Sequence, residues 1–185
     1  MKAITIKLFI IFFFIGVCVS TYAQGNKNLT KGTVIVKGTS TMHDWEMTSA
    51  STKGFIKAEI EGSKVNSVSE VSFSITAETL KSGKSGMDKN AYKAIKTESH
   101  KEITFTSKSV SIDGDKISAK GTLKIAGTSK QATITGKYVV NGGTVSIKGS
   151  TSFKMTSYNV EPPTAMFGSI KTGDEIEISF DVNFK

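Results

Sequence analysis

Alternation of apolar and polar residues runs through most of the chain beyond its first two dozen residues, and this pattern restricts the fold more than any other feature. In residues 117–125 the odd positions are Ile, Ala, Gly, Leu and Ile, whereas the even positions are Ser, Lys, Thr and Lys. Successive side chains of a strand point to opposite faces, so each such segment predicts a strand with one dry face and one wet face. Strands of this kind are typical of antiparallel sheets. The same pattern recurs in residues 65–77, 132–140, 145–153 and 176–184.

The turns between these segments favour a closed barrel. Asp113-Gly114 and Asn141-Gly142 each separate two alternating segments, and both dipeptides favour tight hairpin turns. Several strands span ten or more residues, which is longer than the usual five or six. In residues 65–77 every second residue, including Ser67 and Ser69, is expected to point inward. Long, bent, one-sided antiparallel strands indicate a barrel rather than a flat sandwich.

One segment, residues 82–97, breaks the two-residue period. Met87, Ala91 and Ile95 recur at helical spacing with lysines between them, which predicts a single helix of about ten residues. This helix is expected to close one end of the barrel. The sequence contains no repeat or linker, so residues 24–185 are predicted to form one domain.

Residues 1–23 have the character of a secretory signal peptide. Lys2 and Lys7 precede an apolar run over residues 8–19, and Thr21-Tyr22-Ala23 fits the small-x-small rule for cleavage before Gln24. A lipid anchor on Cys18, the only cysteine, would require a small residue before it, where the chain has Val17. We therefore expect a periplasmic or secreted protein without disulfides.

The charge of the chain excludes some partners. The net charge is +8, and all 24 basic residues are lysine. Without arginine the chain lacks the planar guanidinium that reads guanine and phosphate, so no nucleic-acid partner is expected. Peripheral contact with an anionic envelope surface remains open. An outer-membrane barrel is disfavoured, because its two aromatic girdles would need more Trp and Tyr than the one and four present.

The sequence offers no convincing catalytic or metal site. His43 and His100 are far apart and lack a neighbouring ligand pattern. A nucleophilic role for Ser40 or Thr41 beside His43 is the alternative to a simpler interpretation, in which residues 39–45 form a bend whose hydroxyls satisfy backbone donors. We favour the bend, with a structural His43, and expect no enzyme activity, no cofactor and no metal.

Several segments together resemble the YceI-like family of secreted lipid-binding proteins. Residues 36–45 (VKGTSTMHDW) are similar to the first-strand signature of the family, and residues 85–96 (SGMDKNAYKAIK) to the helix of some of its members. Ile103-Thr104-Phe105, residues 121–128 (GTLKIAGT) and the tail over residues 170–180 follow in the same order as in the family. The resemblance implies an all-β, eight-stranded, lipocalin-like antiparallel barrel with one short helix, which holds a polyisoprenoid in its apolar interior.

The residues themselves leave two functions open. An eight-stranded barrel is just wide enough to be filled by its own side chains or to hold one slender ligand. We expect small inward residues to leave volume for a ligand, and these are Ala77, Ala119, Gly121, Gly136 and Gly149. The alternative is a ligand-free structural or envelope-interaction module with a filled core. The ligand-binding candidates are Trp45, Phe73, Ile75, Phe105, Leu123, Tyr138, Phe153, Met155, Met166, Phe167 and Phe180.

The signal segment makes a prediction about processing. Mass spectrometry or N-terminal sequencing of exported protein should find Gln24 as the first residue, because the basic, apolar and small-residue regions are all in place. Exported material that retains Met1, or that carries a lipid on Cys18, would contradict this prediction.

Overall fold

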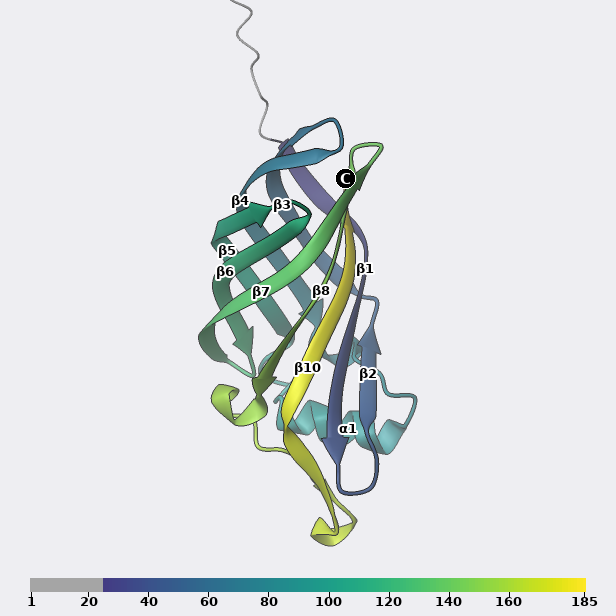
Figure 1. Ribbon diagram of the computed structural model, residues 1–185. Helices are drawn as coiled ribbons and strands as arrows, with labels where there is room; N and C mark the ends of the chain where they lie inside the picture. Colours follow the sequence, from purple (N-terminus) through teal and green to yellow (C-terminus); the bar gives the residue numbers. More distant parts are fainter. Residues whose placement is uncertain (1–24) are drawn as a thin grey trace, which may run out of the picture.

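A computed structural model of the protein describes residues 25–185, so the predicted signal segment and Gln24 lie outside the described residues. Strands dominate this part of the chain (Figure 1). They are β1 (Gly25–Ser40), β2 (Trp45–Ser49), β3 (Thr52–Glu61), β4 (Lys64–Thr76), β5 (Glu102–Asp113), β6 (Lys116–Ile125), β7 (Thr128–Asn141), β8 (Thr144–Lys154), β9 (Thr164–Ala165) and β10 (Ile170–Phe184). The helices are α1 (Ser85–Ala94) and three short 3-10 helices, η1 (Ala77–Thr79), η2 (Met155–Tyr158) and η3 (Met166–Gly168).

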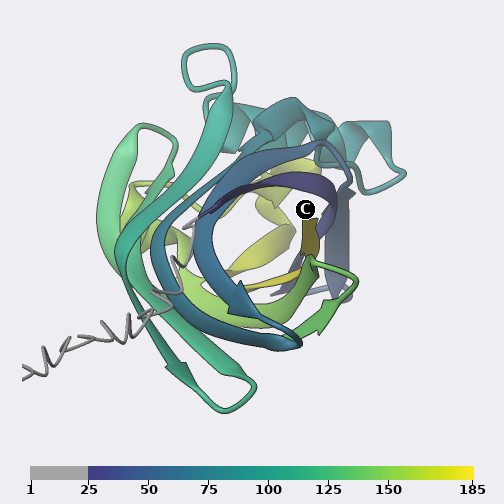
Figure 2. The same cartoon turned by 90° about the horizontal axis from the view of Figure 1, so that it is seen from above.

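The strands form a closed antiparallel barrel, as the sequence predicts. Each strand from β3 to β8 pairs with the next, β8 pairs with β10, and β10 pairs with β1 to close the ring of eight (Figure 2). The long strand β1 is shared on its other side, because Gly25–Asn28 pairs with β3 and Val34–Gly38 pairs with β2. The short strand β9 pairs only with the start of β10, and the two form a hairpin that extends beyond the barrel.

The two ends of the barrel differ. The β3–β4, β5–β6 and β7–β8 turns and the C-terminus lie at one end, which we call the packed end (Figure 1). The other, which we call the open end, carries α1, η2, the β1–β2 turn and the β9–β10 hairpin. A dense apolar cluster fills the packed end, and a second cluster surrounds the open end. Buried members of the packed cluster are Ile56, Ala58, Val65, Val68, Ile117, Tyr138, Val140, Val145, Ile147, Val182 and Phe184.

The predicted faces are confirmed for most strands and wrong for part of β4. Ile117, Ala119, Leu123 and Ile125 of β6 are all buried, as the alternation predicts. In β4, however, Val68 is buried and Ser69 is exposed. The cause is a β-bulge: Lys57 pairs with Glu70 and the next residue, Ala58, pairs with Val68, so Ser69 is passed over in the register. An extra residue reverses the faces on one side of a bulge, and a strict two-residue period cannot anticipate it.

The expectation that inward glycines leave empty volume is wrong at two positions. A Cβ on Gly149 would lie 2.1 Å from the carbonyl oxygen of Thr135 and 2.7 Å from the Phe180 ring. A Cβ on Gly121 would likewise lie 2.9 Å from the Phe105 ring. These glycines therefore give space to a neighbouring aromatic ring and to the next strand, an arrangement known from other sheets as aromatic rescue.

We predict that Gly149→Ala destabilises the barrel by about 3 kcal/mol or more, because backbone atoms cannot move away from the added methyl group. The matched control is Gly86→Ala, in the first turn of α1, where an added Cβ meets nothing within 4 Å. That change should be neutral or stabilise by up to ~1 kcal/mol. Urea unfolding of both variants tests this, and equal stabilities would refute it.

Candidate functional site

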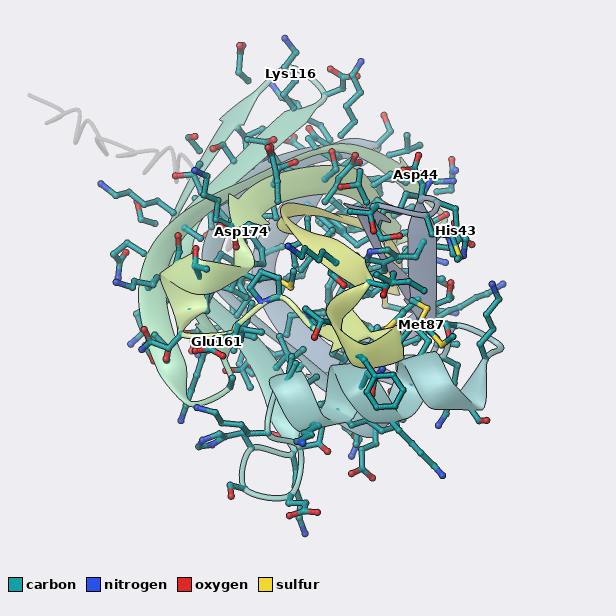
Figure 3. All side chains as sticks on the ribbon, turned by 90° about the horizontal axis from the view of Figure 1, so that it is seen from below. His43, Asp44, Met87, Lys116, Glu161 and Asp174 are labelled. Atoms are coloured by element: carbon teal, nitrogen blue, oxygen red, sulfur yellow. The ribbon has the colours of Figure 1, made fainter. Side chains whose placement is uncertain are left out.

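An apolar chamber of about 610 Å³ occupies the open end of the barrel. Its walls come from β1, β2, β8, β10, α1, η2 and the β9–β10 hairpin. A smaller inner cavity of about 130 Å³ lies deeper, between the strands. Val36, Ile103 and Ile178 border both spaces, so the inner cavity adjoins the chamber along the barrel axis. Viewed from below, α1 crosses this end, and Met87 of α1 lies on the same side as His43 (Figure 3).

The helix α1 supplies one wall of the chamber. Its residues Met87, Ala91 and Ala94, with Ile95 just after its end, border the chamber, so the predicted helix and its apolar stripe are confirmed. The start of α1 is fixed by Asp88, which accepts hydrogen bonds from the Ser82 hydroxyl at 2.6 Å and from the Ser82 backbone N–H at 2.8 Å. These two bonds hold the pKa of Asp88 below its usual value.

A second group of bonds ties the middle and end of α1 to the segment after β4. The Tyr92 hydroxyl lies 2.8 Å and 2.7 Å from the carbonyl oxygens of Glu78 and Leu80. It also accepts a hydrogen bond from Lys81 Nζ at 2.6 Å, which raises the pKa of Lys81. Thr97 Oγ1 donates to Glu78 Oε1 at 2.8 Å. The wall that α1 forms is therefore anchored at several points along its length.

The segment η2 forms another wall, opposite β2. Met155 and Tyr158 border the chamber, and the Tyr158 ring packs against Phe153 with 4.8 Å between ring centroids. Burial raises the pKa of Tyr158. Asp174 of β10 holds η2 in place by accepting bonds from the Thr156 backbone N–H at 2.9 Å and from its hydroxyl at 2.7 Å. The same two bonds lower the pKa of Asp174.

The β1–β2 turn forms part of the mouth. As predicted, it is a bend held by a hydroxyl: Ser40 Oγ accepts from the backbone N–H groups of Met42 and His43 and lies 2.7 Å from the His43 carbonyl oxygen. Trp45 Nε1 donates to the Thr39 carbonyl at 3.0 Å, and the indole covers Gly38 of the paired strand. His43 borders the chamber, with Nδ1 2.7 Å from the Asp44 carbonyl oxygen.

The structure brings together nine of the eleven ligand-binding candidates. Trp45, Phe153, Met155 and Met166 border the chamber. The candidates that border the inner cavity are Phe73, Ile75, Phe105, Leu123 and Phe180. The inner cavity also contacts Ala119 and Gly136, two of the small residues expected to leave volume.

The remaining two candidates border neither space. Tyr138 is buried at the packed end, where its hydroxyl lies 3.4 Å from the Val65 backbone nitrogen. The alternation correctly predicts that Tyr138 points inward, but it does not show which end of the barrel is filled. Phe167 is fully exposed, because it lies at the tip of the β9–β10 hairpin with a positive φ of 56°.

Sequence reasoning missed several lining residues. Val36, Met47 and Leu80 border the chamber, and none was a candidate. Ile176 and Ile178 also border the chamber and were not candidates, although the alternation places both on the inward face of the last strand. Met47 and Leu80 lie on a five-residue strand and beside a 3-10 helix, where no periodic pattern is long enough to detect.

Two further features bear on chemistry. Over residues 25–185, no three His, Asp or Glu side chains gather closely enough to hold a metal ion. Nor does this part of the chain contain a helix of the length and hydropathy needed to cross a membrane.

The closed antiparallel barrel with an apolar chamber beneath one helix defines a lipocalin-like class of protein. The family profile of the YceI-like domain matches residues 25–184. The chain belongs to this family.

Solved structures of three bacterial proteins share the fold. BcnA of Burkholderia cenocepacia is 17% identical with a TM-score of 0.68, over 82% of this chain and 95% of that one. A polyisoprenoid binding domain from Saccharophagus degradans, described as implicated in plant cell wall breakdown, is 12% identical with a TM-score of 0.67, over 86% and 97%. The YceI protein of Campylobacter jejuni is 18% identical with a TM-score of 0.60, over 72% and 81%. No curated protein matches the chain significantly.

The Asp88 contacts predict a pH-dependent stability. Because the folded state lowers the pKa of Asp88, its stabilising effect is present above the unfolded pKa of about 4 and is lost as the pH falls through the folded value. Asp88→Asn should therefore lower the free energy of unfolding by about 2 kcal/mol at neutral pH. The difference from wild type should shrink on acidification. Denaturant unfolding across the pH range measures it, and a constant difference would contradict the assignment.

Proposed function

We propose that the protein binds an isoprenoid-type lipid in the chamber and inner cavity, and that it acts as a periplasmic or secreted carrier without catalysis. The observation that carries this proposal is the chamber of about 610 Å³, continued by a narrower apolar space of about 130 Å³. Volumes of a few hundred cubic ångströms are typical of sites for small ligands. The Saccharophagus degradans domain of the same fold, a polyisoprenoid binding domain, adds support.

The lining determines what kind of ligand fits. The inner cavity is bordered by aliphatic and aromatic side chains, with Thr104, Thr135 and Thr151 as the polar exceptions. Each methylene-sized unit buried in such a space gains about 0.8 kcal/mol. The gain is hydrophobic and does not depend on ion pairs, so affinity should change little with salt. A narrow inner space beyond a wider chamber favours a slender, linear tail over a bulky ring system.

Polar groups border the chamber only where it approaches solvent. Lys84, Lys89 and Asn90 of the α1 segment border it, and His43 lies at the mouth of the same space. A lipid would therefore lie with its tail in the inner cavity and its polar head at the open end. This orientation requires no proton transfer and no covalent step, and so accords with a binding role.

The alternative of a filled, ligand-free module predicts that nothing enters the barrel. Organic extracts of protein purified from its native compartment without detergent should contain a prenyl lipid detectable by mass spectrometry. Extracts free of lipid, together with no uptake of added polyprenol, would favour the ligand-free module.

A cavity-filling variant sharpens the test. Ala91 of α1 borders the chamber, so Ala91→Phe should obstruct it and weaken binding of a dansyl-labelled polyprenol by about tenfold or more, since two displaced methylene units suffice for that loss. The control is Ala50→Phe, at an exposed position between β2 and β3. Fluorescence titration measures both affinities, and thermal melting confirms that both variants fold. Equal affinities would contradict a ligand in the chamber.

A further inference from the structure

An exposed apolar tip projects beside the mouth of the chamber. Phe167 is fully exposed, and Met166 and Met42 are 69% and 66% exposed. Among the described residues, these three and Val139 are the large apolar side chains left most open to solvent. The β9–β10 hairpin carries Met166 and Phe167 away from the barrel, and the β1–β2 turn carries Met42.

The two loops are bonded to each other and form one unit. The Thr41 backbone N–H donates to the Lys171 carbonyl at 3.0 Å, and the Lys171 backbone N–H donates to Thr41 Oγ1 at 3.1 Å. At the end of the hairpin, Met166, Phe167 and Gly168 all have positive φ, of 52°, 56° and 89°. For Met and Phe this conformation costs free energy, and here it holds an aromatic ring in water. This exposed and strained arrangement does not stabilise the folded barrel.

The charges around the mouth indicate what the tip contacts. Three segments at the open end, residues 40–45, 80–97 and 161–173, carry six lysines and three acidic residues. One of those acids, Asp88, is buried against Ser82. Lys84 and Lys89 border the chamber itself and no acidic side chain of residues 25–185 does, so the charged groups at its rim are positive.

We infer that the open end docks on an anionic lipid bilayer, with Phe167 and its methionine neighbours inserted among the headgroups and the lysines near the lipid charges. The inference rests on the proposed function, because a lipid carried in the chamber has to leave a bilayer and return to one. Apolar and aromatic side chains flanked by lysines bind membrane interfaces in this way. The apolar tip and the rim lysines both lie at the mouth, so docking there lets lipid enter without crossing bulk water.

The test is cosedimentation of the full mature protein with vesicles of phosphatidylcholine containing phosphatidylglycerol, compared with vesicles of phosphatidylcholine alone. Wild type should bind the anionic vesicles, and salt should weaken the binding. Phe167→Ser should lower the partition coefficient by about tenfold, whereas Val139→Ser, an exposed apolar control on the wall of β7, should leave it unchanged.

The lysines are tested in the same way. Lys93→Gln with Lys96→Gln, on the helix segment, should weaken binding by about fivefold per charge, and Lys120→Gln with Lys124→Gln, on the side of β6, should not. If wild type binds neither kind of vesicle, or if Phe167→Ser binds like Val139→Ser, the inference is overturned. A wild-type dimer that Phe167→Ser disperses, without vesicle binding, would also overturn it, because the tip would then be a self-association surface.

Uptake of dansyl-labelled polyprenol without vesicles separates this inference from the proposed function. Phe167 borders neither cavity, so Phe167→Ser should take up the polyprenol as wild type does. If the wild-type protein takes up no polyprenol, the carrier role is refuted, whatever the vesicle experiment shows.

Discussion

The pairing of β1 with β10 is the contact on which the rest of the structure depends. It extends from Leu29 opposite Phe184 to Ser40 opposite Thr172, almost the full length of both strands. With it, eight strands close into a ring that fixes the width of the interior, and the short strand β2 keeps an outer edge, bridged at Thr48 to Lys81. At that width, Phe184 and its neighbours can fill the packed end, and the open end stays hollow unless something else occupies it. Fold and site therefore follow from the same closure.

Aromatic side chains form the cavity walls in a recurrent way. Phe180 lies over Gly149, Phe105 over Gly121 and Trp45 over Gly38, in each case on a neighbouring strand. Each ring lies close to the wall because the residue beneath it has no side chain. Because these glycines have no side chains, the aromatic rings pack against the strand backbone and leave the centre of the narrow interior free. A ligand in this interior would meet flat rings held in fixed positions.

Much of the fold could be predicted from the sequence because one-sided strands impose a simple period. Strand faces such as that of β6 and the helix α1 follow from this period and its single interruption, and the tight turns and long strands add the closed barrel. The bulges in β4 could not be predicted, since the extra residues shift the faces without a distinctive residue type. Six candidates on the predicted inward faces border the chamber or the inner cavity for the same reason that the faces were correct, and these are Phe73, Ile75, Phe105, Leu123, Phe153 and Phe180. Trp45, Met155 and Met166 border the chamber from a short strand and from 3-10 helices, which the two-residue period does not describe.

What the sequence could not show is position along the barrel axis. Tyr138 and Phe73 look alike as inward aromatic residues, yet Tyr138 lies at the packed end and Phe73 borders the inner cavity. Their difference depends on how far each strand extends past its partners, which is a property of the register of the whole sheet. The exposed Phe167 depends on a hairpin backbone that a local pattern of Met, Phe and Gly does not reveal.

The position of Trp45 gives the protein an intrinsic optical reporter. It is the only tryptophan of the chain, and it borders the chamber with its indole nitrogen bonded to the Thr39 carbonyl. A guest that replaces water along this ring lowers the local polarity without altering the barrel. The emission of an indole shifts to shorter wavelength in less polar surroundings, so the unlabelled protein reports occupancy of its own chamber.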